Sequence, residues 1–313
     1  MPIILPPITR RQFIQRSLAF GGTAIMAPHA LAAADRKGAG LDQSRVALLA
    51  DTHISADSSQ RYPGTKWPGT PVKEEDHEWV NMADCLTEAA KSIIALNPRP
   101  AHLIVNGDCT FGNGSEAEYQ QFLTLVEPIR AAGITIHVTI GNHDIRENLW
   151  KLIPFLKKEQ MGVQAGVIEL PHANLVLLDS GKGTLGDKQL NWLAKQLDER
   201  ADKPALIFGH YNPYPNRGVR PIKGMRDGAS LLKLLAERKH ARGYFYGHTH
   251  EWQYDQRDHL HLINQPAVSY YFGKGHAHGW VDMKLSETTA ELELQCIDPK
   301  HKQHREQRQV TLK

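Results

Sequence analysis

Residues 45–53 read Arg-Val-Ala-Leu-Leu-Ala-Asp-Thr-His, an apolar run that leads into three polar residues. A short, continuous apolar run of this kind is typical of a buried strand. We expect the strand to cover Arg45–Ala50, so that Asp51 and His53 follow its carboxyl end. Ligands of open α/β sheets bind beyond the carboxyl ends of the strands, so this end of the run is a candidate site.

The same arrangement recurs along the chain. Apolar runs at 102–106, 134–140, 205–208 and 243–246 each lead into a turn that contains glycine and at least one residue able to bind a metal ion. The residues of these turns that can bind metals or act beside them are Asp108, Asn142, His143, Asp144, His210, His248 and His250.

Segments with the 3.6-residue apolar periodicity of helices separate most of these runs. Helices are expected over residues 79–96, 115–132, 147–158, 187–199 and 228–238. Ser115 and Glu118 have the spacing of a capping box. After His250 the pattern changes to β segments without helices. Strands that alternate with helices predict an α/β fold, in which helices pack on sheets.

The chain has 313 residues, of which 41% are hydrophobic, so it can bury a sizeable core. We interpret residues 45–313 as one large domain with a β-rich C-terminal part, preceded by a small, polar linker at 33–44. The net charge of +3 is modest. Because the basic residues form no stripe, no nucleic-acid partner is expected. The three cysteines show no disulfide framework.

Residues 1–32 are typical of a twin-arginine export signal. Arg10 and Arg11 precede a mildly apolar stretch at 17–26, and residues 30–32 (Ala-Leu-Ala) offer a cleavage site. The alternative is a short basic amphipathic helix on the mature protein. The signal predicts passage through the twin-arginine export machinery and a periplasmic or secreted location. No membrane anchor is expected after its removal, since the apolar stretch is too short for a stable span.

The polar residues at the strand ends can form two sets of four metal ligands. The first set is Asp51, His53, Asp108 and His250, and the second is Asp108, Asn142, His210 and His248. The aspartate common to both sets can bridge two ions with one carboxylate. Aspartate, asparagine and imidazole suit divalent or trivalent first-row metals, so two ions such as Mn, Fe or Zn are expected.

This order of motifs resembles the calcineurin-like metallophosphoesterases, and among them the cyclic-nucleotide and glycerophosphodiester phosphodiesterase branch. The motifs D-x-H, G-D, G-N-H-D, a lone H and G-H-x-H occur here in order between Asp51 and His250. One such element is a weak signal, whereas five in order are specific. Purple acid phosphatases share this core but place a tyrosine ligand where this chain has Phe111, which excludes that subgroup.

The resemblance implies a fold and a mechanism. The fold is a four-layer α/β/β/α sandwich of two mixed sheets flanked by helices, with the metal centre at the carboxyl ends of the strands. The implied reaction is hydrolysis of a small-molecule phosphoester, a diester in preference to a monoester, by a hydroxide that bridges two metal ions. His143 would face the leaving group and either protonate it or stabilise the charge on it, and Asp144 would hold the other nitrogen of His143. The alternative is a non-catalytic module that binds metal or phosphate on the same fold.

Three further residues near the strand ends are candidates to contact the substrate. Arg146 follows the Gly-Asn-His-Asp turn, and Tyr211 and Arg217 follow the lone histidine. Arg146 has the alternative role of an ion pair at the start of a helix. The loop at 57–79 leaves the D-x-H motif directly, and it is either a cover for the metals or an ordinary surface loop.

Overall fold

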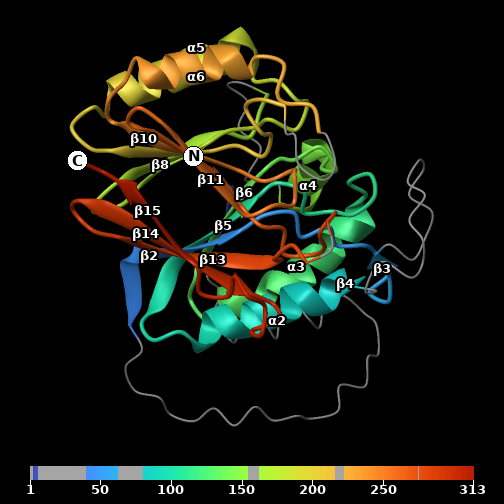
Figure 1. Ribbon diagram of the computed structural model, residues 1–313. Coiled ribbons are helices and arrows are strands. Elements are labelled where there is room, and N and C mark those ends of the chain that lie inside the picture. Colours follow the sequence, from blue (N-terminus) through green and yellow to red (C-terminus); the bar gives the residue numbers. More distant parts are fainter. Residues whose placement is uncertain (1–2, 6–39, 63–79, 154–161, 216–221, 274) are drawn as a thin grey trace.

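The computed structural model describes residues 3–5, 40–62, 80–153, 162–215, 222–273 and 275–313. Two large sheets face each other, and helices cover the outer face of each (Figure 1). The helices α2 and α3 lie on one side of this pair of sheets, and α5 and α6 lie on the other. The predicted α/β/β/α sandwich of two mixed sheets is therefore confirmed.

The first sheet has seven strands in the order β1-β6-β5-β2-β13-β14-β15. Its neighbours β2, β5 and β6 are parallel to one another, whereas β13, β14 and β15 add antiparallel strands. In sheet order the strands are Ile3–Leu5, Thr135–Thr139, Arg99–Asn106, Leu41–Leu49, Gly279–Leu285, Thr289–Cys296 and Gln307–Thr311.

The second sheet has six strands in the order β11-β12-β10-β9-β8-β7. The four central strands are parallel, and the two edge strands are antiparallel to their neighbours. In sheet order they are Gln253–Arg257, Leu260–Asn264, Ala241–Tyr246, Ala205–Phe208, Asn174–Leu177 and Gly166–Glu169. A separate two-stranded ribbon joins β3 (Arg61–Tyr62) to β4 (Val80–Asn81).

The helices of the described residues lie close to their predicted positions. They are α2 (Met82–Ala95), α3 (Glu116–Ala131), α4 (Arg146–Leu152), α5 (Gly186–Asp198) and α6 (Gly228–Ala236). The capping box at the start of α3 is present, because the Ser115 side chain accepts from the Glu118 N–H and the Glu118 carboxylate accepts from the Ser115 N–H. This pair satisfies N–H groups that the first helical turn leaves without partners.

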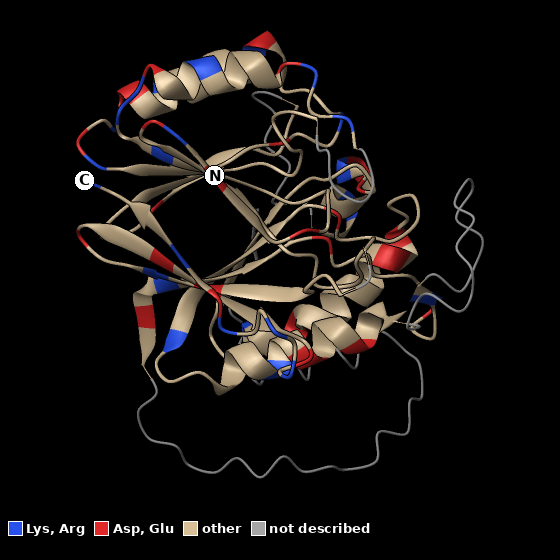
Figure 2. Cartoon of the chain, in the orientation of Figure 1, with Lys and Arg blue, Asp and Glu red and all other residues tan. Residues whose placement is uncertain are grey.

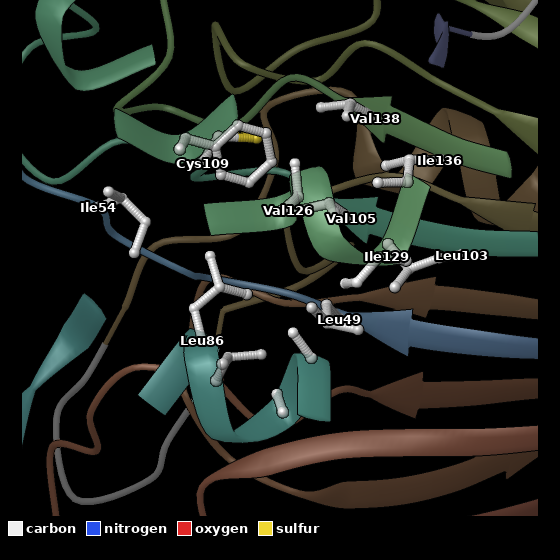
Figure 3. Close-up of a cluster of buried hydrophobic side chains, with 14 of the residues drawn as sticks. Leu49, Ile54, Leu86, Leu103, Val105, Cys109, Val126, Ile129, Ile136 and Val138 are labelled. Atoms are coloured by element: carbon white, nitrogen blue, oxygen red, sulfur yellow. The ribbon is translucent and has the colours of Figure 1, made fainter. Parts of the chain in front are cut away.

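Apolar side chains fill three layers: between the helices α2 and α3 and the first sheet, between the two sheets, and between the second sheet and the helices α5 and α6. Figure 3 shows the first layer, in which Leu49 and Val105 of the strands meet Leu86 and Val126 of the helices. Alternate residues of a strand point to opposite faces. Because both faces of β2 are covered, the run at 45–50 is apolar at every position after Arg45.

Two element boundaries differ from the sequence prediction. Strand β2 begins at Leu41 instead of Arg45, because Leu41 and Asp42 already pair with β5 before a register shift, so part of the predicted linker is strand. The helix α2 begins at Met82 because Asn81 caps it, with its side chain accepting from the Asp84 N–H.

Most of the predicted export signal lies outside the described residues. Three of its residues, Ile3–Leu5, form β1 and pair antiparallel with β6. Within the described ranges, no helix has both the length and the apolarity needed to cross a bilayer. Lys/Arg and Asp/Glu residues are interspersed along the described chain (Figure 2).

Candidate metal centre

The predicted ligands lie at turns where the backbone is strained. Asp51, His53, Asp108, His248 and His250 all have positive φ angles, between 45° and 68°. Residues with a Cβ atom avoid this left-handed region, and each such residue costs on the order of 1–3 kcal/mol. Strain that gathers at one group of turns is a mark of a functional site.

Polar contacts join the ends of the two sheets at this place. Asn106, the last residue of β5, donates to the carbonyl of Phe245 in β10 at 3.1 Å and to Gln265 Oε1 at 2.6 Å. The His248 N–H lies 3.1 Å from both carboxylate oxygens of Asp51. These bonds bring turns from different sheets to one centre.

The first group of side chains consists of Asp51, His53 and His250, all buried. The Nε2 atom of His250 lies 3.3 Å from Asp51 Oδ1 and 3.1 Å from Nε2 of His53. His53 Nε2 also lies 3.6 Å from Oδ2 of Asp108. Asp108 thus borders this group, as the predicted first ligand set requires.

The second group consists of Asp108, His210 and His248, whose potential ligand atoms all lie within 4.8 Å of one another. His210 Nε2 lies 3.2 Å from Asp108 Oδ2 and 3.2 Å from Asn142 Oδ1. Asn142 itself is exposed, which opens this side of the centre to solvent. The structure therefore brings all seven predicted ligands together, with Asp108 between the two groups.

The hydrogen bonds of the histidines test whether a cation fits. His250 Nδ1 lies 2.7 Å from the carbonyl oxygen of Tyr270, so Nδ1 carries the proton and the lone pair of Nε2 faces the centre. The Nε2 atom of His53 also faces the centre, 3.1 Å from Nε2 of His250 and 3.6 Å from Oδ2 of Asp108. A donor set of nitrogen and oxygen atoms that converge in this way fits a first-row metal ion.

Burial and neighbouring charges shift the pKa values of side chains in the centre. Burial raises the pKa of Asp108, but the neighbouring histidines His210 and His53 outweigh burial and hold it well below its usual value. Burial lowers the pKa of His210, but Asp108 and Asp51 outweigh it and raise the pKa to about 9. Burial lowers the pKa of His248 to about 3, so this imidazole is neutral, which is the form that binds metals.

His143 lies beside the two groups, and with His53 and Asp108 it forms a third set of side chains whose potential ligand atoms lie within 4.8 Å of one another. Its ring centroid is 4.8 Å from that of His53, and the two rings are perpendicular. His143 Nδ1 lies 2.7 Å from the Phe111 carbonyl oxygen and 3.1 Å from that of Gly112. These carbonyls fix the ring with Nδ1 protonated, which leaves Nε2 for a substrate.

The prediction that Asp144 holds His143 is wrong, because backbone carbonyls occupy that nitrogen. The Asp144 carboxylate instead accepts from the N–H groups of Gly141 at 2.9 Å and Cys109 at 3.1 Å. It also accepts from the hydroxyl of Tyr119 at 3.1 Å. Burial, with a contribution from Asp108, raises the pKa of Asp144 to about 6. Asp144 therefore ties together the two turns that carry Asp108 and Asn142.

The three predicted substrate contacts have different outcomes. The prediction for Arg146 is wrong: its guanidinium is buried and bound to Asp179 Oδ2 at 3.0 Å and to the Gly162 carbonyl at 3.1 Å. This is the ion-pair alternative, although its partner is not on the same helix. Tyr211 lies at the centre, with its ring centroid 4.2 Å from that of His248. Arg217 lies outside the described residues.

Glycine is required at two of the turns because the backbone passes so close to the ligands. A Cβ atom at Gly141 would lie 2.1 Å from Asp108 Oδ1. A Cβ atom at Gly247 would lie 2.3 Å from Asp51 Oδ2. Both separations are far below any van der Waals contact, so a side chain at either position would displace a predicted ligand.

Sequence reasoning missed an aromatic layer behind the first group. The ring of Tyr270 stacks on Tyr62 at 3.8 Å between centroids and on His53 at 5.0 Å. Phe272 stacks on His250 at 4.4 Å. Both Tyr270 and Phe272 follow β12 and belong to no motif, so only their place in the fold reveals them. They shield one side of the centre from water.

The fold and the site define an α/β/β/α protein that gathers aspartate, asparagine and histidine side chains at the joined ends of two sheets. The sequence profile described as "Calcineurin-like phosphoesterase" matches residues 44–252. The chain therefore belongs to the calcineurin-like phosphoesterase family. This family hydrolyses phosphoric esters with metal ions, so the chain is assigned to this class of hydrolases.

Known proteins agree with this assignment. The chain is similar to the "3',5'-cyclic adenosine monophosphate phosphodiesterase CpdA" of Pseudomonas aeruginosa, with 26% identity over 72% of this chain and 77% of that protein. It is 27% identical to the "Glycerophosphodiester phosphodiesterase GpdQ" of Enterobacter lignolyticus over 64% of this chain and 74% of the relative. A solved dimetal phosphatase from Danio rerio shares the fold, with a TM-score of 0.63 and 15% identity, covering 86% of this chain and 99% of the other.

Proposed function

We propose that this protein is an exported phosphodiesterase that holds two metal ions and attacks its substrate with a bridging hydroxide. The observation that carries the proposal is the convergence of seven nitrogen- and oxygen-bearing side chains around the shared carboxylate of Asp108. When bound, the ions supply a hydroxide near neutral pH and stabilise the charge on the phosphoryl oxygens.

The proposed ligands fall into the two groups that share Asp108. Asp51, His53, Asp108 and His250 would hold one ion, and Asp108, Asn142, His210 and His248 would hold the other. The identity of the ions follows from availability as much as from these ligands, since Mn, Fe and Zn all accept such a set.

His143 is the proposed general acid. Its Nδ1–H is held by the Phe111 carbonyl, so Nε2 is the atom that can deliver a proton to the leaving oxygen. The ring is half-buried and borders the predicted ligands, so it is accessible to a substrate at the centre. A positioned acid of this kind contributes about 10²–10⁴-fold to the rate. Asp144 supports it indirectly, by fixing the turn from which His143 projects.

A diester substrate is supported by the similarity to proteins named as cyclic-nucleotide and glycerophosphodiester phosphodiesterases. The test compares hydrolysis of bis-p-nitrophenyl phosphate and p-nitrophenyl phosphate by the metal-loaded protein. We expect the diester to be hydrolysed with the higher kcat/KM. A higher kcat/KM for the monoester would overturn the diester assignment.

Two variants separate catalysis from metal binding. We expect His143→Ala to retain both ions and to lose at least about 10²-fold in kcat, because only the acid is removed. Asp108→Asn should lose metal as well as activity. If the protein bound two ions and hydrolysed no ester, the alternative of a non-catalytic metal- or phosphate-binding module would be correct.

Export is proposed from the sequence of residues 1–32, and the twin-arginine machinery is the proposed partner. This route suits a protein that acquires metal before it crosses the membrane. The test replaces Arg10 and Arg11 by lysine and follows the protein by cell fractionation. We expect the wild-type protein in the periplasm or medium and the variant in the cytoplasm, whereas an unchanged distribution would contradict the proposal.

A further inference from the structure

Arg226 lies near the His248 side of the centre and belongs to none of the motifs. The Tyr211 ring, which borders His248, has its hydroxyl end against Gly183: a Cβ atom at Gly183 would lie 3.4 Å from Cζ and 3.6 Å from the hydroxyl oxygen of Tyr211. The carbonyl of Gly183 accepts a hydrogen bond from the N–H of Arg226 at 2.9 Å. A continuous series of contacts thus leads from His248 through Tyr211 and Gly183 to Arg226.

The backbone around Arg226 is fixed from two sides. The N–H of Met225 donates to the carbonyl of Asn212 at 2.9 Å, which ties the segment to the loop after His210. The carboxylate of Asp227 accepts from the hydroxyl of Thr184 at 2.7 Å. The backbone of Arg226 is therefore pre-organised, and only its side chain remains to be ordered when a ligand binds.

The Arg226 side chain is exposed, and within the described ranges no carboxylate forms an ion pair with it. Arg146, by contrast, is neutralised by Asp179. The backbone of Arg226 lies beside Gly183, against which the hydroxyl end of Tyr211 packs, so the side chain of Arg226 begins at this side of the centre.

We propose that Arg226 is a specificity-determining residue, which binds an anionic group of the substrate separate from the scissile phosphate. Tyr211 and Gly183 stand between Arg226 and the predicted ligands, so the guanidinium meets a more distant part of the substrate. Its planar fork of donors matches a phosphate or a carboxylate. The preferred substrate is then a phosphodiester that carries a second negative group. This inference rests on the proposed phosphodiesterase function.

The test uses two esters that differ in one charged group. They are the p-nitrophenyl ester of thymidine 5′-phosphate and the same ester with an additional 3′-phosphate. Both release p-nitrophenolate, so the chemistry of the leaving group is identical. We expect the wild-type protein to have a lower KM for the ester that carries the 3′-phosphate. Arg226→Ala should abolish this preference by raising that KM about tenfold, the effect of one partly solvated charge-assisted hydrogen bond. The KM of the ester without the 3′-phosphate and both kcat values should stay unchanged.

Two further variants complete the design. Arg226→Lys keeps the charge and loses the fork, so it should restore part of the preference. Lys91→Ala removes the same charge from α2, on the opposite outer layer, and should leave the preference intact. Equal KM values for the two esters in the wild type, or an equal loss in Lys91→Ala, would overturn the assignment of Arg226. Failure to hydrolyse either ester would instead overturn the proposed function.

Discussion

A buried ion pair joins the strand that leads to Asp51 to its neighbour in the first sheet. Arg45 of β2 donates from Nε to Asp282 Oδ1 at 2.8 Å and from Nη2 to Oδ2 at 2.6 Å. Its Nη1 donates to the Pro98 carbonyl at 2.6 Å. The two side chains are only 8% and 3% exposed, so neither charge has water to replace a lost partner.

Removal of one partner from such a pair costs about 3–5 kcal/mol of unfolding free energy. Asp282→Asn should cost an amount at the lower end of this range, because the amide keeps one acceptor oxygen and Arg45 keeps its hydrogen bond to the Pro98 carbonyl. Arg45→Met belongs at the upper end of this range, because among the described residues the remaining carboxylate then pairs only with the exposed ammonium of Lys284 at 3.9 Å. The double variant Arg45→Met/Asp282→Leu buries no charge, so we expect it to be more stable than either single variant.

The assay is chemical and thermal unfolding at a fixed metal concentration. The single variants should lower Tm by roughly 6–20 °C, at about 2–4 °C for each kcal/mol. Lys91→Ala, which removes the exposed pair with Glu88, is the control and should cost less than about 1 kcal/mol. The reasoning is refuted if the single variants are as stable as this control, or if the double variant loses the sum of both single effects.

Three further outcomes are expected. Gly141→Ala should weaken metal binding by about 10–100-fold, because the added Cβ atom would lie 2.1 Å from Asp108 Oδ1. Gly40→Ala is the control and should leave metal binding unchanged, because no atom lies within 4 Å of a Cβ atom at that position. Titration with the metal measures the affinity of both variants. Burial lowers the pKa of His137 to about 3, so the folded state requires the neutral ring. The contribution of the neutral His137 ring to the free energy of unfolding is complete above about pH 6.5. Below about pH 6.5 this contribution falls by up to about 1.4 kcal/mol for each pH unit. Unfolding measured from pH 7 to 4 should therefore show a flatter profile in His137→Gln, and an equal slope would contradict this. A chelator should lower Tm and added Mn²⁺ should restore it, since metal binds the folded state; a Tm insensitive to both would contradict a metal centre.

Much of the fold could be predicted from local pattern. The apolar run at 45–50 has no polar alternation because β2 is covered on both faces, and this is visible in the sequence. The Ser115–Glu118 spacing predicts the start of α3, because a capping box needs only residues three positions apart. The glycines beside the ligands are also local signals, since Gly141 and Gly247 leave no room for a Cβ atom.

The gathering of the predicted ligands follows partly from the sequence. Parallel strands such as β2, β5 and β6 end at the same edge of a sheet, so the residues after them lie together. The ends of β9 and β10, which belong to the other sheet, meet this edge because the two sheets pack against each other. The contact from Asn106 to Phe245 is one such link. The strained backbone at five residues of these turns is likewise visible only in the structure.

Partners that are distant in sequence were decided by the tertiary structure alone. Arg146 pairs with Asp179, Asp144 accepts from Tyr119, and Arg45 meets Asp282 across 237 positions. A local pattern records the periodicity and the burial of a segment. It holds no information about which distant side chain completes a buried charge or hydrogen bond, because that choice depends on how the layers pack.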